Sequence, residues 1–200
     1  MQPMPSNGDA VSVDSDKGAV QEIARHLRHG QSAPRVAIIH YWLVGMRGKA
    51  GLITQHDNDK ELIDALFDVM AAGKADFTLT FYNMSRLDIE PTEQDRDLHA
   101  LFDDPEQIDQ WVRQWRARLH DEGSIDTTRQ AGMRAVNPVY IPRNHLVEAA
   151  IRSAEDNNDF SVFLDLHAVL QRPFERQPEM DAYMLPPEPH EVVEQTFCGT

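Results

Sequence analysis

Apolar residues recur at intervals of three and four along most of the chain, the spacing that places them on one face of an α-helix. Caps and breakers bound these runs, as where Asp104 and Pro105 begin one helix and Gly73 ends another. We therefore expect a mostly α protein, a compact array of about seven to ten short helices. The predicted helices cover residues 19–29, 36–47, 57–73, 76–87, 104–123, 126–136, 143–157 and 159–172.

Two of these segments also fit a strand. Residues 36–47 begin with a short apolar run, but the apolar residues that follow keep helical spacing. Phe77, Leu79 and Phe81 alternate as in a strand, whereas Phe77, Phe81 and Met84 fit a helix. We favour a helix for both, because the neighbouring segments are helical.

Composition divides the chain into three parts. Residues 1–35 are a polar leader whose first 17 residues we expect to be disordered, residues 36–175 carry the helical pattern, and residues 176–200 form a proline-rich tail. The net charge of −14 argues against nucleic-acid binding, which needs clustered Lys and Arg. The sequence has no basic and apolar secretory signal and no apolar run long enough to cross a bilayer. We therefore expect a soluble cytoplasmic protein that binds neither nucleic acid nor membrane.

The stretch "GMRGKAG" at residues 45–51 resembles a phosphate-binding loop only superficially. Its glycine spacing is too short, and Ala50 stands where that loop needs a hydroxyl for Mg2+. A helix C-terminus explains it better. Its arginine and lysine would lie near the last carbonyls, and Gly48 or Gly51 would adopt the left-handed conformation.

Other candidate residues have ordinary structural interpretations. His26 and His29 could share a metal, but two histidines without carboxylate partners are more often solvated surface residues. His167 lies on an apolar helix face and is expected to be a hydrogen-bonded core residue. Trp111 and Trp115 are expected to lie in the core. The residues alone indicate no catalytic, cofactor-binding or metal-binding site.

The stretch "VNPVYIPRNHLVEAAIRSAE" at residues 136–155 places two prolines just before a helix. Asn137 and Pro138 favour a turn, and Pro142 fits the first turn of the helix that follows. A cation near a helix N-terminus is mildly unfavourable, so we expect Arg143 to pair with a carboxylate of another segment. We expect Asn144 to hydrogen-bond a backbone turn, which makes this stretch a structural motif.

The same stretch, written V-N-P-x4-R-N-x-L, resembles the C-terminal region of the selenoprotein O family. Other parts of the chain resemble that family in the same order. They are "WLVGMRGKAGL" from Trp42, "DFTLTF" from Asp76, "LQRPF" from Leu170, "YMLPP" from Tyr183, and the closing "TFCGT". The resemblance covers residues 41–200 and leaves residues 1–35 outside it.

The resemblance implies a protein-kinase-like fold and the transfer of AMP from ATP to Ser, Thr or Tyr hydroxyls of proteins, with Mg2+ or Mn2+. In that family, the groups that bind nucleotide and metal lie in the N-terminal two thirds. The chain is therefore expected to be the helical C-terminal part of a protein adenylyltransferase. It would be inactive on its own, with no catalytic, cofactor or metal residue, and its partners would be protein substrates or the missing kinase-like half.

One terminal residue also matches the family, which ends in a Cys or selenocysteine with a redox role. Cys198 is the corresponding residue here, and an inert terminal thiol is an equally good interpretation. A non-catalytic helical protein-binding module is an alternative function, and it predicts an exposed apolar surface. A small redox or metal protein using Cys198 and His190 is a weaker third possibility.

Overall fold

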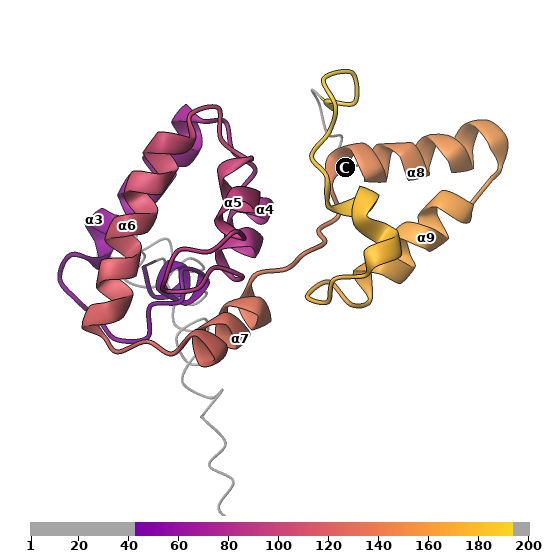
Figure 1. Cartoon of the computed structure of the whole chain (residues 1–200). Coiled ribbons are helices and arrows are strands. Elements are labelled where there is room, and N and C mark those ends of the chain that lie inside the picture. The colour runs from indigo at the N-terminus through magenta and orange to yellow at the C-terminus, as the bar shows by residue number, and fades with distance from the viewer. Residues whose placement is uncertain (1–42, 194–200) are drawn as a thin grey trace, which may run out of the picture. The chain divides into compact units, whose positions relative to one another are not determined.

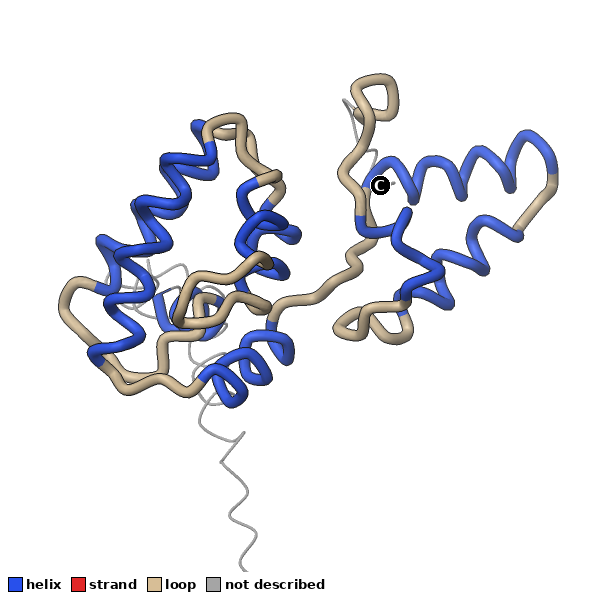
Figure 2. The backbone as a smooth tube through the Cα atoms, in the orientation of Figure 1, coloured by secondary structure: helices blue, strands red, loops and turns tan. Residues whose placement is uncertain are grey.

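The computed structural model describes residues 43–193. The described residues form helices joined by loops, with no strand among them, which confirms the mostly α prediction (Figure 2). A helix over residues 43–49 comes first. It is followed by α3 (Asp59–Ala72), α4 (Phe77–Met84), α5 (Asp95–His99), α6 (Pro105–Asp121), α7 (Asp126–Val136), α8 (Asn144–Asn157), α9 (Ser161–Leu170) and the 3-10 helix η1 (Pro178–Met184).

The chain divides into two compact units, Met1–Val44 and Gly45–Thr200, and almost all described residues belong to the second. The helix predicted at residues 19–29, the leader at 1–35 and the end of the tail lie outside the described residues. None of the described helices has both the length and the apolar character that a membrane-spanning helix needs.

Helices α3 and α6 lie side by side and form the larger core (Figure 1). Asp104 caps α6 by accepting a hydrogen bond from the Glu106 amide at 3.1 Å, and Pro105 occupies the first turn, as predicted. The indole nitrogens of Trp111 and Trp115 donate to backbone carbonyls at 2.8 Å each. Both tryptophans are buried, so their prediction as core residues is confirmed.

Helix α4 is buried on two sides, which explains its ambiguous sequence pattern. Phe81 and Met84 belong to the larger core, whereas Leu79 and Tyr82 belong to a second cluster. A helix that is apolar on two faces has no clear 3.6-residue period. The helix that we favoured over a strand is confirmed for this segment, and for residues 43–47 of the earlier one.

Helix α7 spans the predicted residues 126–136, whereas two other elements differ from the sequence prediction. Helix α5 was not predicted, because its five residues are mostly charged and only Leu98 and Asp95 are buried. Helix η1 lies within the tail that was predicted from its prolines alone. Short elements with few apolar residues give no periodic signal.

Helices α8 and α9 pack against each other and form a helical hairpin (Figure 1). Asn158 ends α8 in the left-handed conformation, at φ 52°, where the sequence predicted a break. Before α8, the amides of Val139 and Tyr140 both donate to the Pro173 carbonyl, at 2.7 and 3.1 Å. Buried Val139 and Tyr140 pack with Val169 of α9 in the second cluster. These contacts hold the hairpin to the segment that precedes it.

Candidate functional site

Residues from three separate sequence motifs meet at one place, which we call the motif junction: Lys49, Asp76, Phe77, Asn137 and Arg143. The first comes from the glycine-containing stretch, the next two from the start of α4, and the last two from the turn before α8. Lys49 and Asn137 are 88 positions apart in the sequence. The motifs therefore describe one packed feature of the fold.

Lys49 and Asn137 are joined by hydrogen bonds in both directions. The side-chain Nδ2 of Asn137 donates to the Lys49 carbonyl at 2.8 Å, and the Lys49 ammonium donates to the Val136 carbonyl at 3.1 Å and to Asn137 Oδ1 at 3.3 Å. The ammonium also lies 5.9 Å from the ring centres of both Phe77 and Phe81. Burial lowers the pKa of Lys49. Lys49 thus caps the C-terminal end of α7.

Arg143 pairs with Asp76, which is the kind of cross-segment carboxylate that the sequence led us to expect. Its guanidinium nitrogens donate to the two carboxylate oxygens at 2.7 and 3.0 Å. The carboxylate also caps α4 by accepting from the Leu79 amide at 2.8 Å. Burial raises the pKa of Asp76, but the hydrogen bonds from Arg143 and Leu79 outweigh it and hold the pKa below its usual value. One carboxylate therefore joins the starts of α4 and α8.

Two details of this turn differ from the prediction. Arg143 is the N-cap of α8 and the helix begins at Asn144, so Pro142 precedes the helix instead of lying in its first turn. Asn144 is exposed, and its side chain makes no hydrogen bond to the described residues, so its expected bond to a backbone turn is not there. Half-buried Pro138 follows buried Asn137 in the connection between α7 and α8.

Arg47, from the glycine-containing stretch at residues 45–51, belongs to a buried network of ion pairs. The Asp59 side chain is fully buried between Arg47 Nε at 3.0 Å and Arg118 Nε at 2.8 Å. Arg118 also pairs with Glu122 at 2.9 Å, and Glu122 accepts from the Thr54 amide at 3.1 Å. Burial raises the pKa of Asp59, but the hydrogen bond from Arg118 more than compensates, so the pKa lies below its usual value.

The sequence did not identify Asp59, although one signal could have done so. Asp59, Ile63, Leu66 and Met70 share the buried face of α3 at helical spacing. A carboxylate on an otherwise apolar stripe indicates a buried cationic partner, because an unpaired buried charge costs several kcal/mol.

Gly51 has a conformation and a location that only glycine fits. Its φ of +72° is left-handed, as predicted for Gly48 or Gly51 at this helix end. A Cβ there would lie 2.6 Å from Met133 Sδ and 2.8 Å from Arg129 Cγ. The stretch over residues 45–51 is thus a helix terminus packed against α7, and the phosphate-loop interpretation is not needed.

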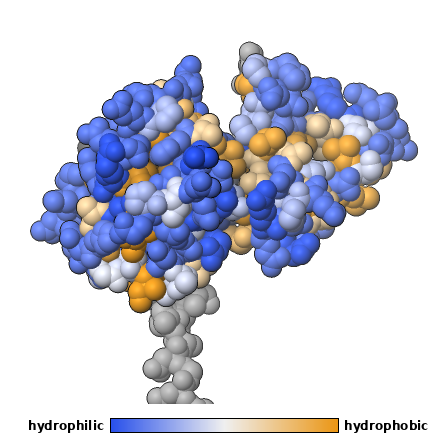
Figure 3. Space-filling model, in the orientation of Figure 1, coloured by the Kyte–Doolittle hydropathy of each residue, from blue (hydrophilic) through white to orange (hydrophobic). Residues whose placement is uncertain are grey.

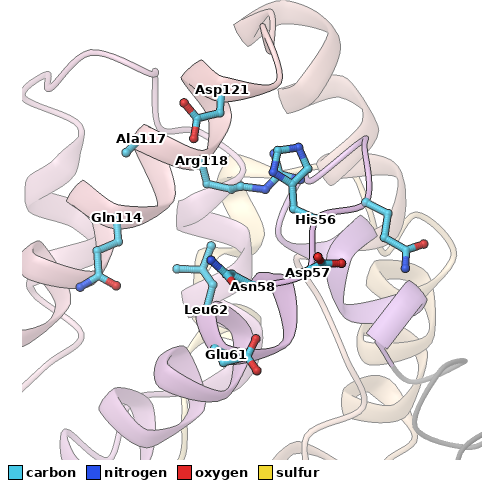
Figure 4. Close-up of a pocket in the computed structure, with 10 residues that line it drawn as sticks. His56, Asp57, Asn58, Glu61, Leu62, Gln114, Ala117, Arg118 and Asp121 are labelled. Atoms are coloured by element: carbon cyan, nitrogen blue, oxygen red, sulfur yellow. The ribbon is translucent and has the colours of Figure 1, made fainter.

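A polar cavity of about 810 Å3 lies between the start of α3 and the face of α6 (Figure 4). Arg118 projects into this region, but its guanidinium is already paired with Asp59 and Glu122. The lining of this cavity also includes the carboxylates of Asp57, Glu61 and Asp121. Three carboxylates beside one already paired arginine make the cavity unsuitable for a phosphate. Within the part of the chain that the structure describes, no group of three or more His, Cys, Asp or Glu residues could hold a metal ion.

An apolar cavity of about 440 Å3 lies between α8 and α9, and we call it the hairpin groove. It is lined by Pro142, Val147, Ala150, Ile151, Ala154, Phe160, Phe163, Leu166, His167 and Leu170. Phe160 and Phe163 remain 55% and 52% exposed, and Ile151 is 45% exposed. Figure 3 shows apolar surface over this hairpin. The described residues thus leave an apolar surface open to solvent.

This groove corrects two expectations from the sequence. The apolar face predicted for α9 is mostly exposed, with Leu166 buried but Phe163 and Leu164 open. His167 is exposed and not a core residue. It stacks on Phe163 with ring centres 6.2 Å apart and pairs with Gln171 at 3.1 Å. Apolar spacing indicates that a face is suited to burial but does not identify what buries it.

Four candidate residues of the sequence remain. Cys198, His26 and His29 lie outside the described residues. His190 is exposed and lines a cavity beside α8 that it shares with Val147 and Ile151 of the hairpin groove.

The fold and the motif junction describe a packed, mostly α region, and sequence comparison gives its family. The model of the family described as "Protein adenylyltransferase SelO" matches residues 33–171, which is more than half of the chain. The chain belongs to this family, and the resemblance drawn from its motifs is confirmed.

Individual proteins that are similar in sequence support the same family. The protein nucleotidyltransferase YdiU of Rhodopseudomonas palustris (strain BisB5) is 48% identical over 190 residues, covering 95% of this chain and 37% of that protein. Its counterpart in Bradyrhizobium sp. (strain BTAi1) is 52% identical over 156 residues, covering 78% and 31%. That of Rhizobium meliloti (strain 1021) is 49% identical over 160 residues, covering 80% and 32%. The chain thus spans about a third of the length of these curated relatives.

Proposed function

We propose that this chain is the helical C-terminal part of a protein adenylyltransferase and that it supports the catalytic part without supplying a catalytic group. The whole enzyme would lie in the cytoplasm and transfer AMP from ATP to Ser, Thr or Tyr hydroxyls of proteins, with Mg2+ or Mn2+. The groups that hold the triphosphate and the metal would belong to the rest of the enzyme.

The internal pairing of the motif cations carries this proposal. Lys49 binds Asn137, Arg47 binds Asp59, and Arg143 binds Asp76 with both ends of its guanidinium. A phosphate clamp needs cations whose donors point into an open site. Two of these cations already neutralise carboxylates and the third is bound to an amide and a backbone carbonyl, which supports a bracing role for these motifs.

Titration of the purified chain with ATP in the presence of Mg2+ or Mn2+ tests the proposal. We expect no saturable heat at ATP concentrations up to about 1 mM. Full-length YdiU of R. palustris (strain BisB5) is the positive control. Saturable binding of ATP by the chain below about 1 mM would contradict the proposal.

A second candidate function is a non-catalytic helical module that binds another protein. The open hairpin groove favours it, because soluble monomers seldom leave several large apolar side chains together at the surface. The two functions differ in the partner, which is the catalytic part of the same enzyme in the first and an unrelated protein in the second.

A redox role of Cys198 stays a prediction. Its reaction with a thiol reagent, compared with that of free cysteine, tests it: an unactivated terminal thiol would react no faster than the free amino acid at neutral pH.

A further inference from the structure

The hairpin groove has the form of a receptor for a third helix. Val147, Ala150, Ile151 and Ala154 line it at helical spacing along α8, and Phe163 lines it from α9. Two packed helices with an open apolar furrow between them accept an amphipathic helix through anchors at positions i, i+3 or i+4, and i+7. The aromatic ring of Phe163, half exposed, is suited to be a central contact of such a helix.

The charge of the hairpin identifies the kind of helix that would bind. Its acidic residues are Glu148, Glu155, Asp156, Asp159 and Asp165. Arg152 is the single Lys or Arg between residues 144 and 170, and it is already paired with Glu148 at 2.9 Å. A negatively charged surface attracts a basic partner.

The same charge disfavours a second copy of the chain as the occupant. Two hairpins facing each other would bring like charges together, and the chain as a whole carries −14. Like-charge contacts across an interface cost several kcal/mol. The end of the chain is also poorly suited, because residues 194–200 contain one acidic side chain and a single large apolar residue, Phe197.

We propose that the hairpin groove binds an amphipathic helix whose apolar face is flanked by Lys or Arg. This inference deepens the proposed function, because the helix would come from the catalytic part of the adenylyltransferase. The experiment below uses neither ATP nor AMP transfer, so its failure would leave the proposed function standing.

The test is a fluorescence titration of the 200-residue chain with two synthetic peptides. The first is a helix of about 18 residues, with Leu at i, i+3, i+4 and i+7 and Lys at the flanking positions. The second has Glu in place of each Lys. We expect one basic peptide to bind per chain, at least about 10-fold more tightly than the acidic one at about 50 mM salt. Raising the salt to about 500 mM should remove most of that preference.

Substitutions locate the binding. F163D should weaken binding of the basic peptide about 30-fold, as loss of a central anchor does. I125D is the matched control, because Ile125 is 65% exposed at the N-cap of α7 and lies outside the groove. It should change the Kd less than about 2-fold. Circular dichroism verifies folding, and I151D provides a second groove variant if F163D is unstable.

Three results would overturn the inference. The first is equal binding of the acidic and basic peptides, and the second is unchanged binding by both groove variants. The third is a concentration-dependent dimer of the chain that F163D dissociates, since that would make a second copy the occupant of the groove.

Discussion

Replacing Arg143 with alanine removes one side of the ion pair that joins the starts of α4 and α8. The side chains of Arg143 and Asp76 are 7% and 18% exposed, so water screens the pair only weakly. The substitution would leave Asp76 largely buried with one capping bond, from Leu79. Breaking a buried pair from one side costs about 3–5 kcal/mol. Because Asp76 keeps its cap and some exposure, we expect a loss near the lower limit, about 3 kcal/mol.

Urea unfolding followed by circular dichroism at pH 7 measures this loss. For a chain of this size, about 3 kcal/mol corresponds to a fall in Tm of about 6–12 °C. R152A is the matched control, because Arg152 and Glu148 form a solvent-screened pair within the same helix that should contribute little to stability. A loss in R143A no larger than in R152A would refute the reasoning.

The pH dependence of the same variant gives a second check. The folded-state pKa of Asp76 lies below its unfolded value, so the pair stabilises the fold above the unfolded pKa of about 3.9 and loses that contribution as the pH falls toward the folded pKa. The stability difference between wild type and R143A should therefore be constant near neutral pH and shrink in acid below about pH 4. A difference that grows in acid would contradict the assignment of the pair.

Two further substitutions test the buried features near the motif junction. D59N would leave Arg47 and Arg118 without their shared carboxylate and should cost about 3–5 kcal/mol in urea unfolding, whereas D64N at an exposed pair should stay within about 0.5 kcal/mol. An equal effect of the two would contradict the network. G51A should cost about 2–4 kcal/mol, because of its left-handed φ and the close sulfur of Met133. G132A, in an open helical position, should be neutral or slightly stabilising, and equal thermal stability of the two alanine variants would exclude the predicted strain.

Local features of this fold could be predicted from the sequence because their causes are local. Asp104 and Pro105 begin α6, and Gly51 and Asn158 end helices in left-handed conformations. Each effect acts within one helical turn and leaves a residue-type signal. The same holds for the tryptophans of α6, which occupy the buried side of a strongly amphipathic helix.

Long-range partners could not be predicted in the same way. Arg143 could be expected to need a carboxylate, but nothing in its neighbourhood indicates Asp76, which is 67 positions away. The face of α9 gave a wrong expectation for a related reason. Phe163 and Leu164 have the spacing of buried residues, yet the described residues leave them exposed. Their burial would depend on a partner, and a partner leaves no mark on the periodicity of a single helix.

The central claim is that these helices support nucleotide transfer without performing it. The most direct test is the transfer of AMP from labelled ATP to protein by the purified chain, with Mg2+ or Mn2+, beside full-length YdiU of R. palustris (strain BisB5) under the same conditions. The account predicts label on protein with the full-length relative and none above background with this chain. Metal-dependent labelling by the chain alone would contradict it.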